Sequence, residues 1–278
     1  SNSSAASDVY KRQLVYYFIA FRNVPRFGTD GILFTRYAID LILIGENPYK
    51  HSMFPAFTKY GLDYKWVTQR LDGAIVDTYS YPALSFILYI PAVLVGLQDI
   101  NLVTVLFYAL TTIFLVMETP KDYRLLPLLV MLLDPNLLLF SYGGVIDVIW
   151  VFFLLLSMKS FDLKNRRKLM VSGALLGIAF AVKQTPWLIL PFLLIWLLKE
   201  GKLKKTLSFL TVVMVAFMIP NLPFIMWNLE SWINGVLTPI LQPLIPEGHG
   251  IASLIFEGYV NLPREWFTVA IVAVATSL

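Results

Sequence analysis

The 278-residue chain contains no cysteine and has only two histidines, His51 and His249. The lack of cysteine excludes disulfides and thiolate metal sites, and two histidines exclude a His-rich metal site. Charged residues make up 14% of the chain, whereas an average soluble domain has about 25%. Hydrophobic residues reach 58%. This composition predicts an integral membrane protein in contact with a lipid bilayer. The net charge of +4 indicates no nucleic-acid partner, because the basic residues lie in short loops between apolar runs.

The two ends of the sequence differ from the rest. Residues 1–13, SNSSAASDVYKRQ, are polar and match neither a signal peptide nor a spanning helix, so we expect a non-native or disordered leader. Residues 14–22 look like the tail of a spanning helix. The last apolar run is too short to cross a bilayer, which needs about 20 residues. We therefore expect residues 14–278 to form one transmembrane domain of a longer protein, truncated at both ends.

A series of apolar runs follows the polar and aromatic segment 23–80. The runs cover residues 81–97, 101–118, 124–142, 147–160, 170–185, 186–198 and 206–226. They predict an all-α fold: a polytopic transmembrane helical bundle with interfacial helices in a long first outer loop. Run 81–97 contains Pro82 and Pro91, each of which removes a helical hydrogen bond. We predict that this run does not cross the bilayer fully.

Lysines and arginines crowd two short loops, residues 159–168 and 199–205. Loops this basic usually stay in the cytoplasm. The two runs between them are expected to form a hairpin, so both loops lie on the same side. Counting outward places Asp147 and Lys183 near the outer face, and Asp30 joins them if run 81–97 does not cross.

The segment GTDGILFTRYAIDLILIGENPY, residues 28–49, predicts an amphipathic helix that begins at Asp30. Gly45 is a suitable C-terminal stop, and Pro48 cannot continue the helix. A carboxylate at a helix start is most simply a cap, so Asp30 is either a cap or a functional group. The apolar stripe consists of Leu33, Phe34, Tyr37, Ala38, Leu41 and Ile42, with Arg36 and Asp40 off it.

Three further residues can carry chemistry. Tyr81 begins an apolar run, where it is an interface anchor or the wall of a groove for a lipid or sugar ring. Asp147 stands at the outer start of a helix, where the dipole favours an anion, so capping competes with function. Lys183 stands at the outer end of another helix, where it either snorkels to the surface or binds a lipid phosphate.

In their order these segments resemble the GT-C superfamily of integral-membrane glycosyltransferases, and in particular bacterial mannosyltransferases that use polyprenyl-phosphate-linked sugars. The match extends over residues 28–191. Two positions depart from the family pattern: Ala83 replaces a second proline, and no glutamine precedes Asp147. The matching positions are Asp30, Gly45-Glu46-Asn47-Pro48-Tyr49, Tyr81-Pro82-Ala83, Pro135 with Gly143 to Asp147, and Gly173, Gly177, Lys183 and Pro186.

The resemblance implies transfer of mannose or another hexose from a polyprenyl phosphate to a hydroxyl of a lipid or glycan acceptor. The reaction would take place on the outer face of a bacterial or archaeal plasma membrane. Asp30 would be the catalytic base and Asp147 a second catalytic carboxylate that orients donor or acceptor. Such chemistry needs no bound cofactor, and a divalent metal stays an open alternative. The implied substrate-binding residues are Lys183, Tyr37, Asn47, Tyr49 and Tyr81.

Two other functions stay open. A transporter or flippase of lipid-linked or small polar substrates would also show intramembrane charges and proline-broken helices, although the chain has no inverted repeat. A non-catalytic assembly subunit would use its carboxylates as caps. The substitution Asp30→Asn separates these cases, because it should abolish an enzyme and leave a scaffold intact.

Overall fold

A computed structural model describes residues 26–64, 67–200 and 203–245, with a few isolated residues after 253. These residues form helices and turns, and the extended pairing among them consists of two isolated β-bridges. The predicted all-α class is confirmed for this part of the chain. Residues 1–13 and the predicted spanning segment 14–22 lie outside the described residues.

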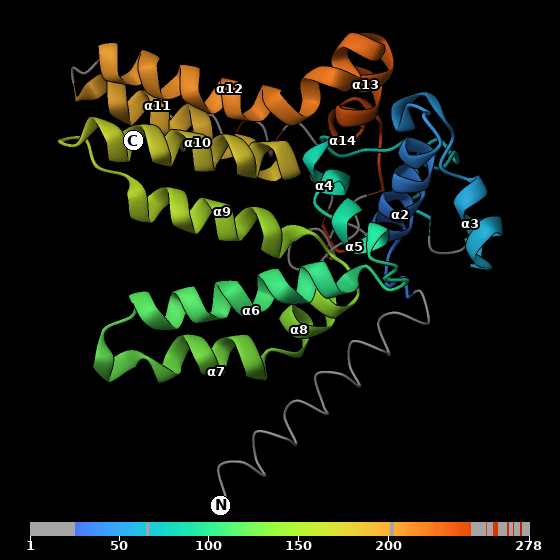
Figure 1. Cartoon of the computed structure of the whole chain (residues 1–278), viewed down its shortest axis with the longest axis horizontal. Helices are drawn as coiled ribbons and strands as arrows, with labels where there is room; N and C mark the ends of the chain where they lie inside the picture. The colour runs from blue at the N-terminus through green and yellow to red at the C-terminus, as the bar shows by residue number, and fades with distance from the viewer. Residues whose placement is uncertain are drawn as a thin grey trace, which may run out of the picture.

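Four helices lie side by side in the larger part of the molecule: α6 (Asn101–Glu118), α9 (Asp147–Ser160), α10 (Arg166–Val182) and α12 (Leu203–Trp227) (Figure 1). Helix α10 packs between α9 and α12, and α11 (Ile189–Lys199) packs against α12. Within the described residues, α6 and α12 are long and apolar enough to cross a membrane. These apolar helices lie side by side, so their ends lie at two opposite faces of the bundle.

Small side chains let α10 approach its neighbours closely. A Cβ added to Gly177 would lie 2.3 Å from the Val213 carbonyl oxygen of α12, and one added to Gly173 would lie 3.2 Å from Phe209. On the other side of α10, the Ser157 hydroxyl of α9 donates to the Ser172 carbonyl at 2.8 Å. Glycines four residues apart and interhelical serine bonds are common at helix contacts in membranes. The glycine pair of the sequence motif thus sets the α10–α12 contact.

One expected run is divided in the structure. Residues 124–142 form two helices, α7 (Leu125–Leu133) and α8 (Pro135–Tyr142), which both pack against α6. Asp134 between them has extended backbone angles, with φ −80° and ψ 104°. Proline disfavours a helical conformation in the residue before it, which explains the break.

A second group of elements covers one end of the bundle (Figure 1). Their buried side chains form one apolar core, which includes Phe57, Tyr79 and Phe86. The apolar run 81–97 contributes helices of four and five residues, too short to cross a bilayer, which agrees with the prediction for this run. The helices of the group are α2 (Asp30–Leu43), α3 (Pro55–Tyr60), α4 (Leu84–Ile87), α5 (Ile90–Leu94), α13 (Leu229–Val236) and α14 (Thr238–Leu241).

The basic loops lie at the opposite end of the bundle from α2 (Figure 1). An ion pair between Lys159 and Glu118 joins the last turns of α9 and α6. The Lys205 ammonium of α12 donates to the Leu163 carbonyl in the α9–α10 loop at 2.7 Å. The two loops that the sequence placed on one side of the membrane are therefore neighbours in the structure.

Candidate active site

Helix α2 begins with a cap that is not Asp30. The cap is Thr29, which has extended backbone angles and whose Oγ1 accepts a hydrogen bond from the Ile32 backbone N–H at 3.4 Å. Asp30 is the first helical residue, so the capping interpretation of its carboxylate is wrong. The helix ends as predicted: Leu43 is its last residue, and Gly45 has a positive φ of 83°.

The Asp30 carboxylate is held by Thr68, a residue of the long segment between the two predicted motifs. The Thr68 backbone N–H donates to Asp30 Oδ2 at 2.8 Å, and the Thr68 hydroxyl donates to the same oxygen at 2.6 Å. Both donors are neutral. The other oxygen, Oδ1, makes no hydrogen bond or ion pair with any residue that the structure describes. Asp30 is thus oriented without being neutralised by a cation.

Asp30 lines three pockets, and the two larger ones share Asp30, Gly31 and Tyr81 as a common wall. We call the first the lysine pocket; its volume is about 140 Å³, and its remaining lining residues are Thr29, Gly144, Val145, Ile146 and Lys183. We call the second the threonine pocket; its volume is about 100 Å³, and its remaining lining residues are Phe34, Thr68, Val76, Tyr79, Ser80, Thr238, Pro239 and Leu244.

Lys183 and Asp147 form an ion pair at the edge of the lysine pocket. The Lys183 ammonium donates to the two Asp147 oxygens at 2.8 and 2.9 Å, and the Trp150 indole N–H donates to Asp147 at 2.6 Å. Asp147 begins α9 but makes no capping bond, because its oxygens are used by these two residues. Lys183 is therefore a paired residue and not a free lysine that extends to the surface. Asp147 fixes the position of the ammonium group.

Tyr81 lines both pockets together with Asp30, and it lies near the Lys183 ammonium group. A Cβ added to Gly31 would lie 3.2 Å from the Tyr81 hydroxyl, so this glycine lets the phenol approach α2 closely. The Lys183 ammonium lies 5.8 Å from the centre of the Tyr81 ring. Burial, and next the negative charge of Asp30, raise the pKa of Tyr81 above its ordinary value. The phenol therefore stays protonated and can donate a hydrogen bond.

Three residues that the resemblance assigned to substrate binding lie outside both pockets. Asn47 is 1% exposed, and its Oδ1 accepts a hydrogen bond from the Tyr49 backbone N–H at 3.0 Å. Tyr49 is buried, and its hydroxyl donates to the Tyr81 carbonyl at 2.7 Å. Tyr37 lies beside Lys59 of α3, with the ammonium 5.8 Å from its ring centre. Asn47 and Tyr49 thus hold the Tyr81 backbone in place through these hydrogen bonds, without lining either pocket.

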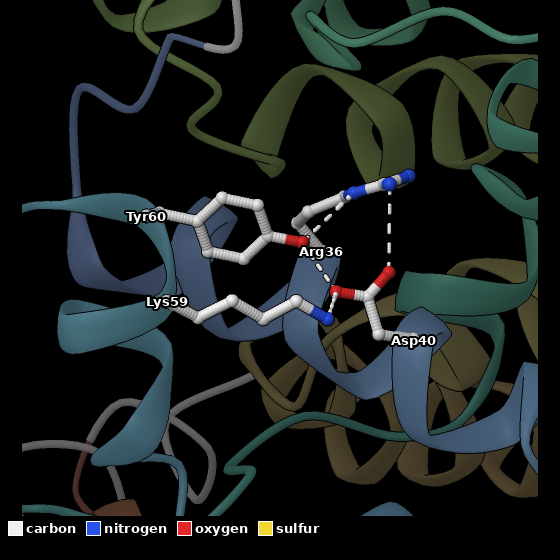
Figure 2. A network of polar contacts seen from close by, with 4 residues as sticks. All are labelled: Arg36, Asp40, Lys59 and Tyr60. Atoms are coloured by element: carbon white, nitrogen blue, oxygen red, sulfur yellow. Dashed lines mark hydrogen bonds and ion pairs between the residues drawn. The ribbon is translucent and has the colours of Figure 1, made fainter.

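A second carboxylate of α2, Asp40, is surrounded by charged and polar partners (Figure 2). Its oxygens contact the Lys59 ammonium at 2.7 Å and the Arg36 guanidinium at 3.4 Å, and accept a hydrogen bond from the Tyr60 hydroxyl. The sequence placed Arg36 and Asp40 off the apolar stripe, but their side chains are only 12% and 15% exposed. Helix α3 supplies Lys59 and Tyr60 and so closes this side of α2.

Two residues near the site were not identified from the sequence. Thr68 has no local signal, because its partner Asp30 lies 38 residues away. Gln184 follows Lys183, and its side-chain amide donates to the Ser80 carbonyl at 2.6 Å and to the Val236 carbonyl at 2.5 Å. These bonds tie the end of α10 to the wall of the threonine pocket and to α13.

Comparisons of the chain with protein-family models, with curated proteins and with solved structures return no match. Within the described residues, no group of three histidine, aspartate or glutamate side chains is placed to hold a metal ion. The function is therefore argued from the geometry. A carboxylate, a protonated phenol and an ion-paired ammonium, drawn from segments far apart in the sequence, meet at two adjoining pockets.

Proposed function

We propose that this protein is a multi-pass membrane glycosyltransferase that moves a hexose from a polyprenyl phosphate to a hydroxyl of an acceptor. One observation carries the proposal: Asp30, Tyr81 and Lys183 meet around two pockets that share a wall. These are three residues that the family resemblance assigned to the reaction. A carboxylate that can take a proton and a cation that can stabilise a leaving phosphate are what the transfer needs.

The proposed membrane location rests on apolar surface that the protein itself does not cover. Only 22% of the apolar stretch of α6 and of α12 is buried within the protein. Leu133 of α7 is 72% exposed, and Met226 of α12 is 78% exposed. In water so large an apolar surface would drive association, whereas a bilayer accepts it. If the basic loops stay in the cytoplasm, the two pockets face the outside of the membrane.

The lysine pocket would receive the donor phosphate. The Lys183 ammonium has three N–H donors, and the contacts with the two Asp147 oxygens leave donor capacity for a phosphate oxygen. Asp147 would keep the ammonium in position when the pocket is empty. Charge-assisted hydrogen bonds to phosphate are short and strong, and here they would become stronger as negative charge develops on the leaving group. The Tyr81 hydroxyl is a second donor next to the same pocket.

Asp30 would act as the general base. The acceptor hydroxyl oxygen attacks the anomeric carbon of the hexose while its proton passes to Asp30 Oδ1. The bond between the anomeric carbon and the phosphate oxygen breaks, and polyprenyl phosphate leaves with the bonding electrons. General base catalysis of this kind contributes about 10²- to 10⁴-fold to a rate. Thr68 occupies Oδ2 and so leaves Oδ1 for the acceptor.

The test is turnover by the full-length protein in proteoliposomes. The donors are labelled polyprenyl-phosphate hexoses, and the acceptors are alkyl glycosides added on the side of the pockets. We expect hexose on the acceptor and an equal amount of released polyprenyl phosphate. Movement of intact donor across the bilayer with no release of polyprenyl phosphate would identify a flippase and contradict the proposal. Vesicles without protein give the background rate.

A further inference from the structure

The threonine pocket has a chemistry of its own, which the donor does not explain. We infer that it is the acceptor subsite, that it takes an uncharged polyhydroxyl group such as a neutral sugar or polyol, and that Thr68 is a positioning residue that aims Asp30 into it. This inference rests on the proposed transferase function, and it deepens that function by naming the class of acceptor.

Apart from the Tyr81 phenol, which is a donor, the threonine and serine hydroxyls that line the pocket already use their protons on protein atoms. The Thr68 hydroxyl donates to Asp30 at 2.6 Å, the Ser80 hydroxyl to the Thr78 carbonyl at 3.0 Å, and the Thr238 hydroxyl to the Asn234 carbonyl at 2.8 Å. Their lone pairs remain available. The pocket therefore offers mainly hydrogen-bond acceptors, and its ligand must bring donors. Sugar hydroxyls are such donors, whereas a phosphate or carboxylate group has only acceptor oxygens at neutral pH.

The charge of the threonine pocket also favours an uncharged acceptor. Among the lining residues that the structure describes, Asp30 carries the one formal charge, and none is a lysine or an arginine. An anionic acceptor would bring like charge against Asp30 without a compensating cation, which disfavours binding. The apolar lining residues Val76, Pro239 and Leu244 can pack against the C–H face of a sugar ring. The two pockets thus differ in kind, because the lysine pocket offers a cation and the threonine pocket does not.

Besides its two bonds to Asp30 of α2, Thr68 is held by contacts of its own turn. The turn closes through a bridge between Gln69 and Ile75, and it lies against the segment that follows α14. The Leu71 N–H donates to the Pro243 carbonyl at 2.7 Å, and the Ile245 N–H donates to the Gln69 carbonyl at 3.1 Å. Because these bonds hold the turn, both donors of Thr68 stay aimed at one carboxylate oxygen. The acceptor then meets the other oxygen.

The first experiment compares Thr68→Val with Thr68→Ser at saturating donor while the acceptor, octyl α-mannoside, is varied. Thr68→Val removes the hydroxyl donor and keeps the backbone donor. Hydrogen bonds to charged groups support an expected loss in kcat of about tenfold or more, with an unchanged KM for the donor. Thr68→Ser keeps the donor and should stay within about threefold of the wild type. Thr58→Val is a matched control at an exposed position of α3 that lines neither pocket, and it should have wild-type kinetics.

The second experiment compares octyl α-mannoside with its 6-phosphorylated counterpart in the wild-type protein. We expect the neutral acceptor to have the higher kcat/KM by about 100-fold. Equal use of the two acceptors would overturn the assigned acceptor class.

The Thr68 variants test the positioning role. If kcat falls in Thr68→Val and also in Thr68→Ser, or if the KM for the donor changes as much as kcat does, Thr68 has a merely structural role and the positioning role is overturned. Transfer that proceeds normally in both variants would also overturn it and leave the transferase function standing. Absence of transfer to any acceptor would overturn the proposed function itself.

Discussion

Helix α2 carries a carboxylate near each end, and the protein holds the two in opposite ways. Asp40 lies against the Lys59 ammonium, the Arg36 guanidinium and the Tyr60 hydroxyl (Figure 2). Among the described residues, Asp30 receives the two neutral donors of Thr68 alone, both on one oxygen. The charge of Asp40 is compensated, whereas the charge of Asp30 lies at the pockets and has no paired cation among those residues.

This difference indicates a structural role for one carboxylate of α2 and a chemical role for the other. A carboxylate bound by cations on both oxygens gains its stabilisation from those pairs and has little capacity left for a ligand. A carboxylate that neutral groups orient can still accept a proton from a bound hydroxyl. We therefore interpret Asp40 as the residue that fixes α3 to α2, and Asp30 as the reactive group.

The largest stability effect should come from the Asp40 end. Asp40→Ala leaves Arg36, which is only 12% exposed, without its anion, and should lower the free energy of unfolding by about 3 kcal/mol. Asp30→Asn keeps a hydrogen-bond acceptor for Thr68 and should change the free energy of unfolding by less than about 1 kcal/mol. Thermal unfolding of the purified variants in detergent measures both. An Asp30→Asn variant as unstable as Asp40→Ala would mean that both carboxylates are structural.

An intermediate case is Asp147, whose carboxylate is paired but lies next to a pocket. Lys183→Met removes the cation and should raise the KM for the donor by about 10- to 100-fold, because a charge-assisted bond to the phosphate is lost. Asp147→Asn keeps the lysine but loosens its position, so the increase should be smaller, about threefold to tenfold. Steady-state kinetics at saturating acceptor give both values. Unchanged donor KM in Lys183→Met would remove the phosphate from the lysine pocket.

The smallest effect concerns Asp99, a carboxylate that is buried with little compensation. It is 1% exposed, its ion-pair partner among the described residues is Arg26 at 4.0 Å, and burial raises its pKa from an ordinary 3.8 to about 6. The folded pKa lies above the unfolded value, so ionisation opposes folding and stability falls as pH rises from about 4 to 6. Asp99→Asn should remove this pH dependence and raise stability at pH 7.5 by about 1 to 2 kcal/mol. Unfolding curves between pH 4.5 and 7.5 check it, and an unchanged slope would contradict the assignment.

Local signals predicted the boundaries of several elements. Gly45 and Pro48 indicated the end of α2, because a positive φ and a missing N–H act within one turn. Pro82 and Pro91 likewise indicated that run 81–97 would not form one long helix. The same rule applied to Pro135 would have predicted the break between α7 and α8. These proline and glycine signals act over a few neighbouring residues, but they are not decisive, because α12 continues through Pro220 and Pro223.

Partners that lie far apart in the sequence could not be predicted in this way. The count of apolar runs from the basic loops, with run 81–97 not crossing, placed Asp30, Asp147 and Lys183 on one side. It could not predict the ion pair between Lys183 and Asp147, which depends on how α9 packs on α10. Thr29 rather than Asp30 caps α2. A shift of one residue in the start of the helix decides whether the carboxylate is used as a cap. The turn that brings Thr68 to Asp30 is bonded to the segment after α14, which is remote in sequence. These contacts are properties of the tertiary structure.

The central claim is that Asp30 takes the proton of the acceptor and does not merely hold the site together. The most direct test measures hexose transfer and donor affinity in one preparation of Asp30→Asn, with Asp40→Asn as the matched carboxylate control. We predict that Asp30→Asn loses about 10²- to 10⁴-fold in turnover while its donor Kd and its folded fraction stay at wild-type values, and that folded Asp40→Asn keeps its turnover. Near wild-type turnover by Asp30→Asn would contradict the claim, and loss of turnover in Asp147→Asn instead would move the base to that carboxylate.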